Sequence, residues 1–144
     1  MAGKSAEPNG AKEAGMSRSG YTEDCEHLGL WRQAVAQAMG GKRGQAALRE
    51  LLAALDAMPV KRLVADALEE NGEYCTLGVL GQARGLDMSD LDAHDYDQIS
   101  ESFNLAKSMV CEIEYENDEG LCRHANPEER WIRMRQWVAE QIKQ

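Results

Sequence analysis

The chain has 144 residues, a length that suits one folded domain and leaves little room for two. Hydrophobic residues make up 43%, too many for a wholly disordered chain, whereas aromatic residues make up only 6%, which disfavours a β-sandwich core. The formal net charge is −9, and no apolar run approaches the ~20 residues of a membrane-spanning helix. The N-terminus has no apolar signal core, so we expect an acidic, mostly helical protein that is neither membrane-embedded nor secreted by that route.

The first fifteen residues are small and polar and show no hydrophobic period. They offer too little apolar surface to offset the entropy lost on ordering. We therefore expect a disordered tail over residues 1–15 and a single compact helical domain over residues 16–144. Met16 is a candidate alternative start of the chain.

Apolar residues recur at spacings of three and four through most of the chain from residue 28, which is typical of amphipathic helices. Gly40-Gly41, Pro59, Asn71-Gly72 and Asn104 interrupt this pattern. The sequence therefore predicts an all-α fold of about six helices. Seven ranges are candidates for them: 28–39, 44–58, 60–69, 74–83, 96–103, 105–117 and 127–142.

The range 74–83 is the least certain of these, because its short apolar run also fits a strand. We favour a helix, since Leu77, Leu80, Gly81 and Arg84 recur at helical spacing. Its glycines would allow close packing against a neighbour. The last helix has a clearer start, because Asn126 precedes Pro127 and two acidic residues.

Charge is distributed unevenly along the chain. Residues 63–120 hold fifteen acidic residues and only two basic ones, a net charge of −13, whereas residues 1–62 and 121–144 each carry +2. A field of this sign steers association with a basic protein and repels nucleic acid. We expect these carboxylates to form an exterior docking surface for a host or defence-system protein with a basic surface. The candidate partner-binding residues are Asp87, Asp90, Asp92, Asp95, Asp97, Glu101, Glu112 and Glu116.

Two other interpretations of the acidic segment remain open. The carboxylates could form a solvated face that only aids solubility, with some of them paired to Arg130, Arg133 and Arg135. They could also imitate the charge of nucleic acid and occupy a basic groove on another protein.

A basic loop offers a different function. Gly40-Gly41-Lys42-Arg43-Gly44 precedes a predicted helix, whose N-terminus favours anions. The alternative to protein docking is therefore a nucleic-acid-associated regulator that uses Lys42, Arg43 and Arg49 together with the C-terminal helix.

Metal binding has weak support. Cys25-Glu26-His27 and Cys122-Arg123-His124 supply zinc-type ligands, but the spacing is too short for common zinc sites. Asp90 to Glu101 has acids at positions one, three and twelve of a calcium loop, yet Asp95 stands where glycine is needed. We expect no metal, no other cofactor and thiols that are not joined in disulfides.

No nucleophile elbow, metalloprotease helix or paired-carboxylate motif stands out, so we expect a protein that is not an enzyme.

One further pattern is carried by the stretches 16–21, 41–59, 61–63, 75–81, 84–89, 112–119 and 127–131. Together they resemble a group of small proteins of unknown activity encoded by phages and prophages of proteobacteria. The likeness covers nearly all of the chain from Met16 onward. It implies a protein of the host cytoplasm that derives from a mobile element, and it transfers no functional residue. Small acidic phage proteins often bind and block a host protein, which makes inhibition an expectation by analogy.

Overall fold

The computed structural model describes residues 28–144, so the expected tail over residues 1–15 and the candidate start at Met16 lie outside the described residues. Over the described range the chain forms six α-helices and one antiparallel hairpin, which confirms the mostly helical domain. The elements are α2 (Leu28–Gly40), α3 (Lys42–Ala57), β1 (Glu69–Glu70), β2 (Glu73–Tyr74), α4 (Thr76–Ala83), α5 (Tyr96–Phe103), α6 (Lys107–Asp118) and α7 (Pro127–Gln141).

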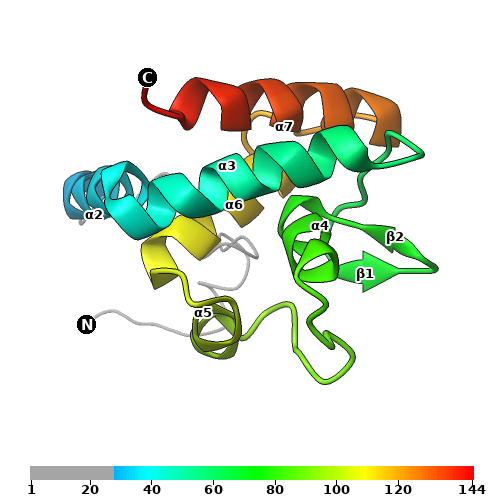
Figure 1. Cartoon of the computed structure of the whole chain (residues 1–144), viewed down its shortest axis with the longest axis horizontal. Coiled ribbons are helices and arrows are strands. Elements are labelled where there is room, and N and C mark those ends of the chain that lie inside the picture. The colour runs from blue at the N-terminus through cyan, green and yellow to red at the C-terminus, as the bar shows by residue number, and fades with distance from the viewer. Residues whose placement is uncertain (1–27) are drawn as a thin grey trace, which may run out of the picture.

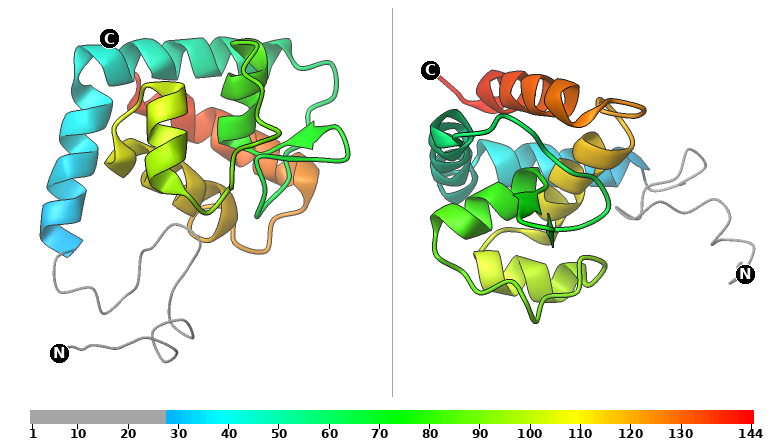
Figure 2. Two further views of the ribbon diagram at one scale, coloured as in Figure 1. Left: turned by 90° about the horizontal axis from the view of Figure 1, so that it is seen from below. Right: turned by 90° about the vertical axis from the view of Figure 1, so that its right-hand side faces the viewer.

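Helix α3 runs along one edge of the molecule, and α6 lies behind it in the view of Figure 1 (Figures 1 and 2). Helix α3 packs against α2, α4 and α7, while α6 packs against α2, α4, α5 and α7. Helix α7 runs along one side of the molecule, and α5 with the loop before it lies on the opposite side (Figures 1 and 2). The core between them is mostly aliphatic. Its largest fully buried apolar side chains are Leu48, Leu51, Leu55, Leu63, Leu77, Leu80, Ile99, Phe103, Met109, Ile113 and Met134.

The corner between α2 and α3 holds the C-terminal end of α7 in place. The buried Gln45 amide donates hydrogen bonds to the Met39 carbonyl at 2.7 Å and to the Gln141 carbonyl at 2.9 Å. Its side-chain oxygen accepts from the backbone N–H of Lys143 at 2.7 Å. All hydrogen-bonding groups of this buried amide are thus used, which joins segments almost one hundred residues apart.

Local signals set several element boundaries as expected. The Asn126 side chain accepts from Glu129 N–H at 2.8 Å and the Glu129 carboxylate accepts from Asn126 N–H at 3.0 Å, a complete capping box. Asn104 ends α5 in the left-handed region with φ 54°. Asn71 and Gly72, with φ values of 54° and 82°, form a turn as expected, although the turn joins two strands of a hairpin instead of two helices.

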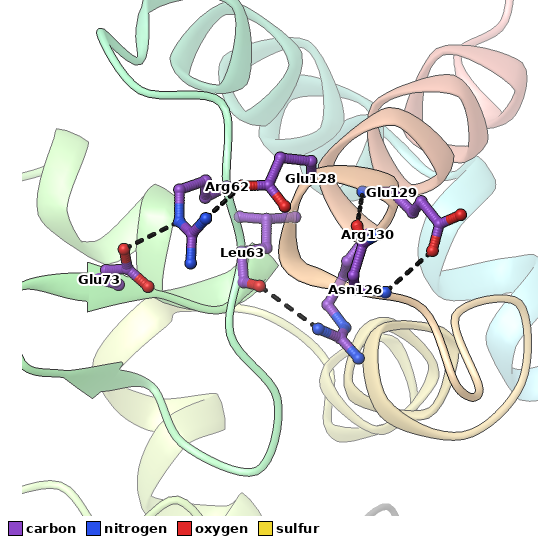
Figure 3. A network of polar contacts seen from close by, with 7 residues as sticks. All are labelled: Arg62, Leu63, Glu73, Asn126, Glu128, Glu129 and Arg130. Carbon is purple, nitrogen blue, oxygen red and sulfur yellow. Dashed lines mark hydrogen bonds and ion pairs between the residues drawn. The ribbon is translucent and has the colours of Figure 1, made fainter.

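The predicted helix over residues 60–69 is wrong. Leu63 N–H donates to the Pro127 carbonyl at 3.1 Å, and Val64 N–H donates to the Tyr74 carbonyl at 3.0 Å. The Leu63 carbonyl in turn accepts from the buried Arg130 guanidinium at 3.4 Å (Figure 3). Because these backbone groups bond to distant segments, an extended path replaces the helix, and β1 begins at the last residue of the predicted range.

The uncertain range 74–83 is mainly helical, as expected, although its first residue belongs to β2. The Cys75 sulfur caps α4 by accepting from Gly78 N–H at 3.3 Å. A Cβ atom at Gly78 would lie 2.0 Å from the Leu68 carbonyl oxygen, so this glycine permits the close packing that the sequence indicated.

No helix within residues 28–144 is both long and apolar enough to cross a membrane.

Candidate functional site

Six of the eight candidate partner-binding carboxylates are exposed. They belong to α5 and to the loop between α4 and α5, at the side of the molecule opposite α7 (Figure 1). Asp97 and Glu101 lie four residues apart on α5 and therefore share one helix face. We call this set the acidic face, and its members are Asp87, Asp90, Asp92, Asp95, Asp97 and Glu101.

Short-range hydrogen bonds shape the backbone under the acidic face. Asp87 accepts from the Ser89 hydroxyl at 2.6 Å and from Ser89 N–H at 3.0 Å, and these bonds lower the pKa of its carboxyl group. Asp92 accepts from His94 N–H at 2.9 Å, and Asp95 caps α5 by accepting from Gln98 N–H at 3.1 Å. These carboxylates therefore fix the loop while their side chains stay exposed.

The acidic face is hardly neutralised by the rest of the described chain. The Lys107 ammonium lies 3.2 Å from Asp97, and both side chains are exposed, so the pair is weak. Arg84, the other basic residue of the acidic segment, pairs instead with Glu50 on α3 at 2.9 Å. That pair lowers the pKa of Glu50 and leaves the acidic face unaffected.

The arginines of α7 do not neutralise the acidic face either. Arg130 donates to the carbonyls of Asn117 at 2.9 Å and Ala125 at 3.0 Å. Arg133 donates to the Leu121 carbonyl, while Arg135 forms a two-pronged pair with Asp56 on α3. Among these contacts the arginines bind carbonyl groups or an α3 carboxylate, so the internal pairing considered from sequence is not seen at the acidic face.

Glu112 does not lie on the expected exterior surface. Its side chain is 2% exposed, and its carboxylate accepts from the Arg32 guanidinium at 2.7 Å, which joins α6 to α2. Glu114, on the same helix, is fully buried, with one carboxylate oxygen 3.6 Å from the Cys75 sulfur. Neighbouring helices cover α6 on several sides, so Glu112 and Glu114, two positions apart, both lie in the interior.

Glu116 does not lie on the expected exterior surface either, because its side chain is only partly exposed. Burial raises the pKa of Glu116 to about 7, and hydrogen bonding with Glu112 adds to this rise. A hydrogen bond from Leu121 N–H at 3.0 Å acts in the opposite direction and lowers the pKa. Glu112 and Glu116 thus share a partly buried site beside Arg32 and do not form part of a free docking surface.

The alternative nucleic-acid contacts are exposed, but two of them are engaged within the molecule. Arg43 donates to the Asn104 side chain at 3.1 Å, and Arg49 donates to the Lys143 carbonyl at 2.7 Å. Lys42 is exposed at the first position of α3. The three cations lie near one another in the sequence. Two of them, however, link α3 to residues that follow α5 and α7.

The candidate metal residues are only partly within the described range. Cys25 and His27 lie outside it, while Cys122 is buried and His124 is exposed. Burial raises the pKa of the Cys122 and Cys111 thiols to about 11, so both stay protonated near neutral pH. Within residues 28–144, no group of three or more His, Cys, Asp or Glu side chains is arranged to hold a metal ion.

Sequence reasoning missed a hollow where the end of α3, the segment after it, the hairpin and α4 meet. Its volume is about 500 Å³. Its lining includes residues 60 and 62 from the segment that was predicted as a helix, so the wrong prediction hid it. The available signal was Asn71-Gly72 between Glu70 and Glu73, a dipeptide typical of a hairpin turn.

Comparison of the chain with models of protein families, with curated proteins and with solved structures finds no match.

Proposed function

We propose that this chain is a non-enzymatic, phage-type docking protein that binds a basic surface of a host or defence-system protein and inhibits or otherwise modulates it. The observation that carries the proposal is the acidic face: six exposed carboxylates within fifteen residues, accompanied by one weakly paired lysine. The resemblance to phage and prophage proteins supports the choice of a host target by analogy.

The acidic face suits association better than fold stability. Carboxylates that cap turns hold the loop in one shape, so less conformational entropy is lost when a partner binds. Exposed charges of one sign also speed the encounter with an oppositely charged surface and become less effective as salt rises. These properties favour docking through charge, with a partner rich in Lys and Arg.

A capture experiment tests the proposal. The full chain, immobilised, is exposed to a proteobacterial lysate at low salt beside a variant that carries Asp90→Asn, Asp92→Asn, Asp95→Asn and Asp97→Asn. Asparagine keeps the size of each side chain and can still cap turns and helices. We expect the parent to retain a basic protein that the variant loses, and we expect added salt to release it.

A second variant provides the matched control. Glu50→Gln, Asp56→Asn, Glu129→Gln and Glu140→Gln remove the same charge from α3 and α7, away from the acidic face and from the lining of the hollow described below. This control should capture the partner as the parent does. Capture that is insensitive to the acidic-face variant and to salt would overturn the proposal. A DNA mobility shift that is lost on changing Lys42, Arg43 and Arg49 to alanine would instead favour the nucleic-acid alternative.

A further inference from the structure

The hollow beside the hairpin has a mostly alkyl lining. Val60 is 59% exposed at its edge, and the adjoining Pro59 is exposed as well. The volume of about 500 Å³ falls in the usual range of ligand sites. The principal apolar lining residues are Ala54, Ala57, Met58, Val60, Val79 and Ala83.

Polar contacts link the segments that surround the hollow. Arg62 Nε donates to the Glu73 carboxylate on the hairpin at 3.1 Å, and Arg62 Nη1 donates to the Glu128 carboxylate in the first turn of α7 (Figure 3). The close approach of Gly78 to Leu68 fixes α4 against the hairpin from the other side. A site on walls that are already fixed loses little entropy when it is filled.

The surroundings of the hollow are acidic. Residues 63–83 contain Asp66, Glu69, Glu70 and Glu73 and no Lys or Arg, while Lys61 beside the lining donates through its ammonium to the carbonyls of Asp56 and Met58. Glu69 and Glu70 are exposed, and neither takes part in the ion pairs found within residues 28–144. The positive charge of Arg62 is shared between two carboxylates, so it does not offset this field.

We infer that the hollow receives an apolar side chain, such as Leu, from a partner segment that carries Lys or Arg on either side of it. The alkyl lining matches the apolar side chain, and the carboxylates of the hairpin match the flanking cations. This inference rests on the proposed function and adds to it a second point of contact, with an apolar anchor that salt does not weaken.

A peptide titration tests the inference directly. The probe is a short Lys/Arg peptide with a central Leu, added to the ¹⁵N-labelled full chain, and its twin has Ser in place of Leu. We expect the Leu peptide to shift the amide signals of Val60, Tyr74, Val79 and Ala83. The Ser peptide should bind at least about tenfold more weakly at these positions, because it lacks the apolar anchor.

Two tryptophan variants provide the matched pair. Ala57→Trp places a large ring in the hollow from the last residue of α3, whereas Ala46→Trp adds the same ring at an exposed alanine three turns earlier on nearly the same helix face. The first should reduce binding of the Leu peptide at least about tenfold, and the second should leave it unchanged. Thermal melting of both variants checks that they fold.

The outcomes separate this inference from the proposed function. Shifts confined to residues 87–101, equal for both peptides, would overturn the inference while leaving the acidic face as the docking surface. Shifts at the hollow alone would support the inference and weaken the role of the acidic face. No shift at the hollow with millimolar Leu peptide would overturn the inference. So would shifts there that depend on protein concentration without peptide, because a second copy would then be the occupant.

Discussion

The acidic face and helix α6 are similarly rich in carboxylates but place them in opposite environments. The acidic face has six within residues 87–101, all exposed, whereas residues 112–119 have five, of which Glu112 and Glu114 are buried. The acidic face occupies a loop and a short outer helix, while α6 packs against four other helices. Local charge density therefore does not determine whether a carboxylate is exposed. The number of elements that pack against its own helix or loop has the larger influence.

The largest effect should come from breaking the pair that supports Glu112. Arg32→Ala removes the guanidinium 2.7 Å from this buried carboxylate, so we expect the free energy of unfolding to fall by about 2–4 kcal/mol. Lys107→Ala, which breaks the exposed pair with Asp97, should cost no more than about 0.5 kcal/mol. Urea denaturation of both variants measures the contrast, and equal losses would show that Glu112 does not depend on Arg32.

A smaller effect should appear in the pH dependence of stability. The pKa of Glu116 is about 7 in the folded protein, above its ordinary value of 4.5, so the folded state holds an extra proton between these values. Stability should therefore decrease as pH rises from about 4.5 to about 7. Glu116→Gln should remove this decrease and stabilise the protein by about 1–2 kcal/mol above pH 7, after allowance for partial exposure.

The matched control for this pH dependence is Glu101→Gln, which changes an exposed carboxylate of the acidic face. Thermal melting from pH 4.5 to pH 8.5 should give parallel curves for this variant and the parent. A Glu116→Gln curve that is also parallel to the parent would contradict the environment described for Glu116.

At the acidic face a moderate effect should come from the loss of a cap and not from the loss of charge. Asp95→Ala removes the acceptor for Gln98 N–H at the start of α5, so we expect a loss of about 1 kcal/mol. Asp95→Asn keeps an acceptor and should stay within about 0.5 kcal/mol of the parent. Chemical denaturation distinguishes the two, and similar losses would mean that the charge itself stabilises the loop.

The smallest effect should come from Asp90→Asn. Asp90 is exposed, and none of the hydrogen bonds or ion pairs described for residues 28–144 involves its side chain. We expect a change within about ±0.5 kcal/mol in denaturant. A larger loss would indicate that the acidic face supports the fold, which would reduce its value as a docking surface.

Much of the fold could be predicted because local residues determine it. The recurrence of apolar residues at spacings of three and four predicted α3, whose buried face includes Leu48, Leu51 and Leu55, and Asn126-Pro127 predicted the start of α7. The segment 60–69 could not be predicted in the same way. Its apolar spacing resembles a helix, but its backbone bonds to Tyr74, Pro127 and Arg130, and these distant partners are invisible to a local pattern.

The candidate site divides in the same manner. The exposure of the six carboxylates within residues 87–101 could be predicted because loop residues and capping aspartates face solvent. The burial of Glu112 could not, since it depends on Arg32, which lies eighty residues earlier in the chain. The hollow was hidden for a similar reason, because three separate segments and the α7 contact of Arg62 create it.

The most direct test of the contrast between the two regions is carboxyl labelling of the native protein with carbodiimide and glycinamide, with the modified positions quantified by mass spectrometry. Our account predicts rapid labelling of Asp87, Asp90, Asp92 and Asp97, and little labelling of Glu112 and Glu114 until the protein is unfolded. Labelling of Glu112 and Glu114 at the rate of Asp90, or protection of the acidic face, would contradict it.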